Sequence, residues 1–155
     1  MPSTSRYRSS DALYWLFTWA AVALHLSLGF ERSASPLLGL YQIVLISSYA
    51  LLFIAPAWLL TRLTRNTPYG LHAITQVILA GIVQLLIYAD GLLWTLYGFH
   101  LNGFVWNIIT TPGGIEALGS SQSTTRELIL LAAGIMAGQA LLYAFARLLL
   151  RLRPR

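Results

Sequence analysis

Polar side chains that lie within or beside apolar stretches are the first candidates for chemistry in this sequence. Asp90 ends an apolar run, where a carboxylate is costly unless it is hydrated or paired. It is either a functional charge or an interfacial residue that caps a helix break at Gly91. Gln76, Ala80 and Gln84, named here the glutamine stripe, recur every four residues and share one helix face. Such a stripe either forms hydrogen bonds to other helices or lines a polar path for a substrate.

Histidine can ligate haem or a metal, but the spacing of the histidines here is poor. Haem between helices needs two axial ligands at matching depth, and only His25 and His100 approach that requirement, since His72 starts an apolar run on the opposite side. The sequence has no cysteine, which excludes disulfides and thiolate metal sites. It has no phosphate-binding loop, paired-carboxylate site or nucleophile motif. We therefore expect no catalytic residue, no metal and no cofactor in this chain.

The last apolar run carries two glycines, Gly134 and Gly138, with Ala133 and Ala137 beside them. Small residues four apart let helix backbones approach closely inside a membrane. The approach is made either by another helix of this chain or by a partner protein. Together with the glutamine stripe, these glycines are our candidates for helix packing or partner contact.

The composition is that of a membrane protein. Hydrophobic residues make up 57% of the chain and charged residues 10%, against about 25% charged residues in soluble domains. So few charges cannot coat a water-facing surface of this size, and most of the surface must face lipid. The net charge of +5 comes from arginines that flank the apolar runs. Their positions are typical of topology signals rather than of a nucleic-acid-binding face.

Four apolar stretches are each long enough to cross about 30 Å of hydrocarbon at about 1.5 Å per residue. The third can continue past Asp90, and Pro56 predicts a kink in the second. Ser35 and Thr67 are N-cap residues, each followed by a proline at the first helical position. The first stretch exceeds the apolar region of a signal peptide, so we expect a retained anchor. The stretches cover about residues 12–30, 37–60, 71–89 and 128–150.

The arginines set the orientation of the chain. With an even number of spans, eight of them fall on one side of the membrane and only Arg32 and Arg126 on the other. The positive-inside rule makes the eight-arginine side cytoplasmic, so we expect both termini in the cytoplasm. The eight are Arg6, Arg8, Arg62, Arg65, Arg147, Arg151, Arg153 and Arg155.

The long connection between the third and fourth stretches, about residues 91–125, is rich in aromatic and aliphatic residues. Its rings can sit at the level of the lipid headgroups, so we expect an interfacial, helical outer loop. The predicted fold is an all-α membrane protein, a bundle of four transmembrane helices with this outer loop, in a single domain of residues 1–155. The apolar residues of the loop include Trp94, Tyr97, Phe99, Phe104, Trp106, Ile108 and Ile109.

The outer loop carries a pattern of polar and aromatic residues between Asp90 and Leu118. Its members are Asp90, His100, Leu101, Asn102, Phe104, Trp106 and Pro112. This pattern resembles the outer loop in the N-terminal membrane domain of the YejM/PbgA family. That family is related in plan to lipoteichoic acid synthases and phosphoethanolamine transferases. Its members join a helical membrane domain to a periplasmic sulfatase-like domain.

The resemblance implies a role in the lipid balance of the bacterial envelope, at the inner membrane. In the family, the membrane domain contacts a single-span adaptor protein of lipid A synthesis control, and lipopolysaccharide alters that contact. By resemblance, Asp90, His100, Asn102 and Trp106 are candidates for contact with a lipid headgroup, of lipopolysaccharide or of an anionic phospholipid. In the alternative interpretation, His100 and Asn102 only form hydrogen bonds to the backbone of the loop.

The family pattern continues with a fifth span and the sulfatase-like domain, and neither occurs in these 155 residues. We therefore expect a non-enzymatic membrane interaction or regulatory domain, with no nucleic-acid partner. An alternative is the membrane half of a phospholipid-headgroup transferase or sulfatase-like hydrolase whose catalytic domain is missing here. A second alternative is a small transporter or a haem protein.

Overall fold

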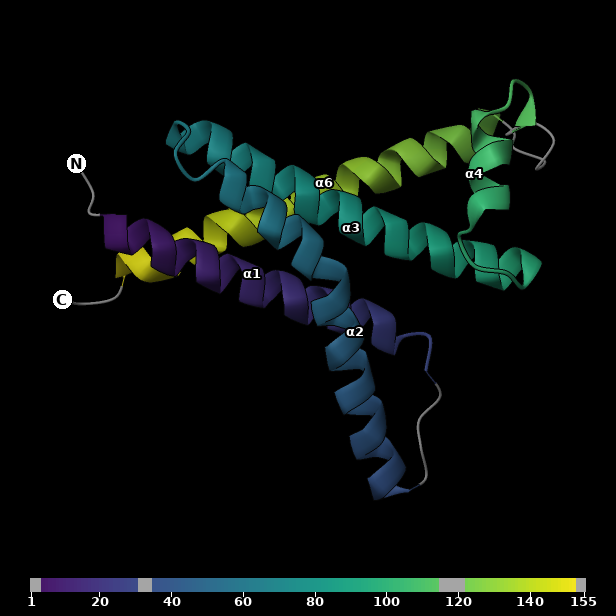
Figure 1. Cartoon of the computed structure of the whole chain (residues 1–155), viewed down its shortest axis with the longest axis horizontal. Coiled ribbons are helices and arrows are strands. Elements are labelled where there is room, and N and C mark those ends of the chain that lie inside the picture. Colours follow the sequence, from purple (N-terminus) through teal and green to yellow (C-terminus); the bar gives the residue numbers. More distant parts are fainter. Residues whose placement is uncertain (1–3, 31–34, 115–121, 153–155) are drawn as a thin grey trace.

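The computed structural model describes residues 4–30, 35–114 and 122–152, and over these ranges the chain is helical, with short turns and no strand (Figure 1). The predicted all-α fold is therefore confirmed. Its helices are α1 Thr4–Ser27, α2 Pro36–Leu63, α3 Tyr69–Tyr97, α4 Gly103–Thr110 and α6 Gln122–Leu152. The side chains of Arg6 and Arg8, together with Arg32, Arg153, Arg155 and residues 115–118 of the outer-loop pattern, lie outside the described parts.

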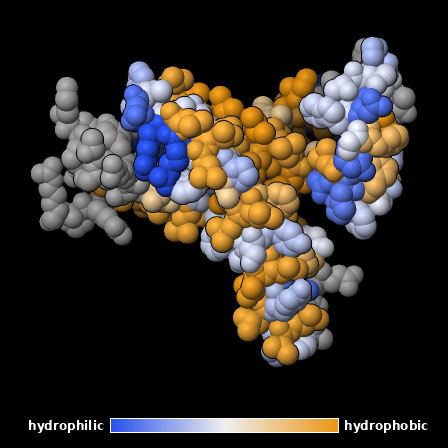
Figure 2. Space-filling view, in the orientation of Figure 1, coloured by the Kyte–Doolittle hydropathy of each residue, from blue (hydrophilic) through white to orange (hydrophobic). Residues whose placement is uncertain are grey.

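Three helices, α2, α3 and α6 from Arg126 onward, are long and apolar enough to cross a membrane. Many of their large aliphatic side chains point outward, and Leu37, Leu63 and Leu141 are at least 70% exposed. Figure 2 shows apolar residues over much of the visible surface. An apolar exterior of this extent is the reverse of a soluble domain and suits a chain surrounded by lipid.

Helix α1 differs from the predicted first span in position and in character. It begins at Thr4 rather than near residue 12, because residues 4–11 contain no proline or glycine that would end a helix. Polar residues such as Asp11 and Thr18 lower its hydropathy, and it is not among the helices that are apolar enough to cross a membrane. A crossing by α1 therefore remains a prediction.

A proline lies at the start of both α2 and α3, and a glycine follows the end of α3. Helix α2 starts directly after its N-cap Ser35, as predicted, whereas the N-cap of α3 is Pro68, one residue later than expected. Helix α3 continues past Asp90 and stops at Gly98, whose φ of 71° is readily adopted by a residue without a side chain. The sequence left a continuation of this span past Asp90 open, and the helix does continue past Asp90.

The four long helices form a ring, because α1 and α3 each contact both α2 and α6. In Figure 1 the start of α1, the connection between α2 and α3, and the end of α6 gather at one end of the molecule. This end is named the arginine end. Toward the opposite end α2, α3 and α6 diverge, and α4 follows α3 there. The described arginines of the arginine end are Arg62, Arg65, Arg147 and Arg151.

The interior of the ring is narrow and made partly of small residues. Ala50 of α2, Ala80 of α3 and Ala146 of α6 are buried and let neighbouring helices come close. One very close approach is at Gly81, where an added Cβ atom would overlap the side chain of Met136 in α6. Gly81 was not among the residues predicted to mediate helix packing.

Helix α2 bends along its length in Figure 1, and it contains Pro56. A proline inside a helix removes one backbone hydrogen bond and crowds the preceding turn, so it commonly produces such a bend. The bend directs the first half of α2 away from the other helices. That half accordingly exposes large apolar side chains, including Leu40 and Ile43.

Candidate functional site

The carboxylate of Asp11, near the start of α1, is the centre of a hydrogen-bonded cluster at the arginine end. Its Oδ1 accepts a hydrogen bond from Nε2 of Gln76 at 2.9 Å, and its Oδ2 lies 3.2 Å from Nε2 of His72. Nδ1 of His72 lies 2.8 Å from the hydroxyl oxygen of Thr64, just after α2. These four residues, named the Asp11 cluster, connect α1, the end of α2 and α3.

The Thr64 hydroxyl has two acceptors within reach beside the Asp11 cluster. Its oxygen lies 3.0 Å from the backbone oxygen of Thr61 and 2.8 Å from Nδ1 of His72. The hydroxyl carries one hydrogen, and a ring nitrogen of histidine is a donor or an acceptor depending on its tautomer, so two hydrogen-bond patterns fit these distances. In both patterns Nε2 of His72 donates to the carboxylate of Asp11.

A second set of polar residues joins α1, α3 and α6 further inside the ring. The hydroxyl groups of Tyr14 and Thr18 donate to Oε1 of Gln139 at 2.8 and 3.3 Å. Nε2 of Gln139 donates to Oε1 of Gln84 at 2.7 Å. Tyr14, Thr18 and Gln139 are almost completely buried, so these bonds take the place of hydrogen bonds to water. These four residues are named the glutamine network.

The glutamine stripe of α3 belongs to both sets. Gln76 and Ala80 are completely buried and Gln84 is half-buried. Gln76 bonds to α1 and Gln84 bonds to α6, so both amides take part in interhelical hydrogen bonds.

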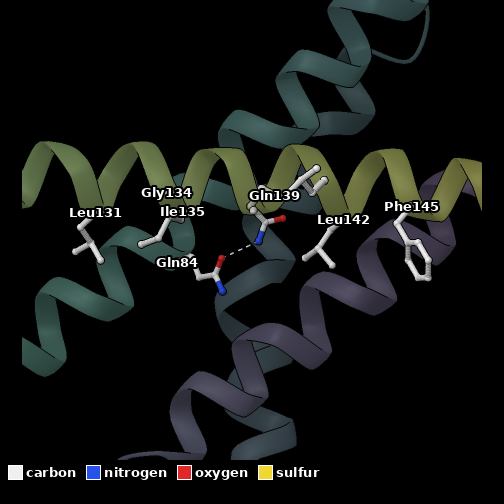
Figure 3. A pocket seen from close by; sticks show the side chains of 9 residues that line it. Gln84, Leu131, Gly134, Ile135, Gln139, Leu142 and Phe145 are labelled. Carbon is white, nitrogen blue, oxygen red and sulfur yellow. Dashed lines mark hydrogen bonds between the residues drawn. The ribbon is translucent and has the colours of Figure 1, made fainter.

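Two amide atoms of this stripe have no hydrogen-bond partner among the described residues. They are Oε1 of Gln76, which is buried, and Nε2 of Gln84. Figure 3 shows the Gln84 nitrogen turned away from Gln139. An unpaired polar atom in an apolar environment costs roughly 1–3 kcal/mol. An acceptor from another molecule would therefore stabilise the protein at Nε2 of Gln84, whereas Oε1 of Gln76 is enclosed by the chain itself.

One face of α6 is open and lined by small and apolar residues. A pocket of about 590 Å³ lies along it, and Figure 3 shows the side chains that line it. A Cβ atom added at Gly134 or Gly138 would meet no atom within 4 Å, so neither glycine mediates close packing within the described chain. The pocket is named the α6 groove, and its lining includes Gln84, Leu131, Gly134, Gly138, Gln139 and Phe145.

Asp90 is the centre of a separate structure toward the opposite end. Its Oδ1 accepts a hydrogen bond from the backbone N–H of Leu101 at 2.7 Å, and its Oδ2 lies 2.8 Å from Nδ1 of His100. The ring of His100 stacks on Trp94, with the ring centres 4.6 Å apart. Asp90 and Trp94 are one turn apart on α3, so these contacts fold the chain after Gly98 back against the helix.

Asn102 begins α4. Its Oδ1 accepts hydrogen bonds from the backbone N–H groups of Phe104 and Val105 at 3.0 and 3.1 Å, which makes it the N-cap of this helix. Val105 is buried, whereas Trp106 is 66% exposed. Of the four residues predicted in the outer loop, three are thus engaged with the protein itself, and Trp106 presents its ring outward.

No group of three or more His, Asp or Glu side chains that could hold a metal ion occurs within the described residues. His72 and His100 are paired with different carboxylates, Asp11 and Asp90. His25 lies near the ring of Tyr88, with centres 6.2 Å apart. The two histidines considered for haem, His25 and His100, therefore have different neighbours.

The contacts of Asp11 with His72 and Gln76 were not predicted from the sequence. Asp11, Tyr14 and Thr18 follow one another at intervals of three and four residues, which places them on one face of α1. This stripe was an available signal, similar to that of the glutamine stripe. The sequence predicted His72 only as a poorly placed haem ligand. Its pairing with Asp11 could not be predicted, because the two residues are 61 positions apart in the sequence.

Comparisons of the chain with models of protein families, with curated proteins and with solved structures give no match. The resemblance of the outer loop to the YejM/PbgA family therefore remains a prediction. The features of the described chain that bear on its function are the Asp11 cluster, the glutamine network, the α6 groove and the long apolar helices.

Proposed function

We propose that this chain is an interaction protein of the inner membrane that holds a transmembrane helix of a partner protein in the α6 groove. The observation that carries the proposal is the groove itself. In it, Gly134 and Gly138 have open space where a Cβ atom would be, and they lie beside Nε2 of Gln84, which has no hydrogen-bond partner among the described residues. In this proposal the chain crosses the membrane four times, with α1 as one crossing and both ends in the cytoplasm.

The glycines favour a helix as the occupant of the groove. Gly134 and Gly138 are one turn apart, so they leave a shallow notch along α6 where another helix backbone can approach closely. Lipid tails are as apolar as leucine, so helices gain little from hydrophobic burial within a membrane. Close van der Waals contact in such a notch is therefore the main source of affinity.

The amide of Gln84 favours a partner with a hydrogen-bond acceptor at the same depth. Gln84 lies in the middle of α3, well inside the apolar part of the helix. A hydroxyl or amide oxygen on the partner helix would accept from its free Nε2. Interhelical hydrogen bonds of this kind contribute roughly 1 kcal/mol in membranes.

The polar contacts of α1 support its placement across the membrane despite its lower hydropathy. Tyr14 and Thr18 face Gln139 inside the ring, and both are completely buried. Leu16 and Leu24 are 53% and 67% exposed and would face lipid. The polar side chains of α1 are thus paired within the protein, which removes much of the cost of burying this helix in hydrocarbon.

A non-enzymatic role is supported by the geometry around His72. Thr64, His72 and Asp11 follow one another in the order hydroxyl, imidazole and carboxylate, which is the order of a hydrolytic triad. However, the backbone oxygen of Thr61, 3.0 Å from the Thr64 hydroxyl oxygen, competes with His72 for the one hydrogen of that hydroxyl. The resemblance of the outer loop suggests the kind of partner, a single-span adaptor protein of lipid A synthesis control.

The test compares the same substitution at two open helical glycines. Gly138→Leu fills the groove, whereas Gly39→Leu places the same side chain on α2, where the glycine also has no neighbour within 4 Å. We expect Gly138→Leu to lower co-purification of the adaptor with the tagged chain by about fivefold or more, which corresponds to about 1 kcal/mol. Gly39→Leu should leave it unchanged.

Equal recovery of the adaptor with both variants would exclude the groove as its binding site. A second copy of this chain is the other possible occupant, and it can be tested separately because the chain has no cysteine of its own. Disulfide-linked dimers formed by Gly138→Cys, but not by Gly39→Cys, would overturn the proposal of a different partner protein.

A further inference from the structure

A second, polar pocket lies at the arginine end between α1, α2 and α3. Its volume is about 160 Å³, whereas one water molecule takes up about 30 Å³ in the liquid. Figure 2 shows a hydrophilic, hollowed patch at this end, beside an otherwise apolar surface. The pocket is named the arginine pocket, and its lining includes Asp11, Trp58, Arg62, Arg65, His72 and Gln76.

The arginines of this pocket are available to a ligand. The guanidinium carbon of Arg62 lies 4.0 Å from the centre of the Trp58 ring, which holds this side chain in place. Arg65 is exposed, and its side chain has no ion pair or hydrogen bond among the described residues. Asp11 is the carboxylate of the pocket, and it is already paired with His72 and Gln76. The positive charge of the two guanidinium groups is therefore not neutralised.

We propose that the arginine pocket binds a phosphate group, that of a membrane phospholipid, with Arg62 and Arg65 as its ligands. A guanidinium group presents a fork of N–H donors that matches two phosphate oxygens at once. Basic pockets between membrane helices on the cytoplasmic side bind anionic headgroups by this chemistry. Asp11, His72 and Gln76 also line the pocket, and the carboxylate of Asp11 is engaged there by the other two side chains.

The position of the pocket matches the level of the lipid phosphates. Arg62 lies in the last turn of α2, at the boundary between its apolar part and the turn before α3. Trp58, one turn earlier, has the amphipathic ring that is common at headgroup level. This inference uses the membrane placement proposed above, but it does not depend on the α6 groove or on a partner protein.

The test is a lipid titration of the purified full chain in detergent, followed by native mass spectrometry. Arg65→Gln removes one ligand of the phosphate, and we expect it to weaken phosphatidylglycerol binding by about tenfold, the usual effect of losing a charged hydrogen bond. Arg151→Gln is the matched control. It removes the same charge from an exposed residue at the same end, outside the pocket, and should leave binding unchanged.

Equal loss of binding in the two variants would indicate general attraction by positive charge and would overturn the proposal. Displacement of the lipid by inorganic phosphate at a similar concentration would identify a soluble phosphate compound as the ligand and would overturn the lipid assignment. Circular dichroism of each variant excludes unfolding as the cause. A negative result leaves the α6 groove unaffected, since the groove is tested by Gly138→Leu.

Discussion

Asp11 is the residue on which the arginine end depends most directly. Its two carboxylate oxygens accept hydrogen bonds from Gln76 and His72, which both lie on α3. Because the side chains of His72 and Asp11 are only 12% and 20% exposed, water cannot easily replace either bond. The carboxylate thus connects α1 to α3 at a point where the two helices otherwise have little contact.

Asp11→Ala should therefore lower the free energy of unfolding by roughly 1–3 kcal/mol, because it leaves the Gln76 amide and the His72 ring without their acceptor. Thermal unfolding in detergent, followed by circular dichroism, measures this loss. Asp11→Asn keeps one acceptor oxygen and should cost less. The same unfolding temperature for the alanine variant and the unchanged protein would contradict the role assigned to Asp11.

Asp90 has a local role in the outer loop. Its Oδ1 accepts from the backbone N–H of Leu101, so Asp90→Ala should raise the hydrogen-exchange rate of this amide by about tenfold, which is the loss of about 1.4 kcal/mol of protection. Asp90→Asn keeps an acceptor and should retain most of the protection. Unchanged exchange at Leu101 in the alanine variant would show that the loop holds its fold without Asp90.

At the scale of helices, α6 has two faces with different packing. On one face, the side chain of Met136 occupies the space where a Cβ atom on Gly81 of α3 would be. On the other face, a Cβ atom added at Gly134 would meet no atom within 4 Å. A leucine at position 81 must displace the end of the Met136 side chain, whereas a leucine at position 134 points into open space. The two faces therefore separate the internal packing of the chain from its proposed contact with a partner.

We expect Gly81→Leu to lower the free energy of unfolding by about 1–3 kcal/mol, since overpacking displaces Met136 and the backbone around it. Gly134→Leu should not destabilise the isolated protein. Unfolding of both variants in the same detergent gives the comparison. A larger loss at position 134 than at position 81 would mean that the contact between α3 and α6 is assigned to the wrong face.

Sequence patterns predicted the helices better than they predicted the contacts between them. Pro36 sets the start of α2, because the fixed φ of proline is a local effect, and Ser35 occupies the N-cap position without a capping hydrogen bond from its side chain. The glutamine stripe marked the polar face of α3, because the four-residue spacing of its members is also a local feature of the sequence. The contact of α3 with α6 at Gly81 was not predictable, because it depends on how α6 is rotated, and no local pattern records that rotation. The partners of Asp11 are 61 and 65 residues away, beyond the reach of any helical period.

At the scale of the whole molecule, the hydrogen bonds of the Asp11 cluster join α1, α2 and α3 at the arginine end, while α2, α3 and α6 diverge toward the other. In a membrane with four crossings, the turn between α2 and α3 and the outer loop lie on opposite sides. Asn66 and Asn107 are exposed residues of these two segments. Since the chain has no cysteine, one introduced cysteine reports on one position only.

In intact cells whose outer membrane has been made permeable, Asn107→Cys should react with a membrane-impermeant maleimide, and Asn66→Cys should react only after lysis. This result follows from the arginines at the end that carries Asn66. Labelling of Asn66→Cys before lysis would reverse the orientation. Labelling of both positions from the same side would contradict the crossing by α3.

The hydrogen bonds of α1 also constrain the order in which the protein is built. The hydroxyl of Tyr14 bonds to Gln139, which is 125 residues later in the chain, so α1 leaves the ribosome long before its acceptor is synthesised. Lipid offers no substitute acceptor during that interval. The hydroxyl of Tyr14 therefore gains this acceptor only when the last helix is in place, so the packing of α1 is completed at the end of synthesis.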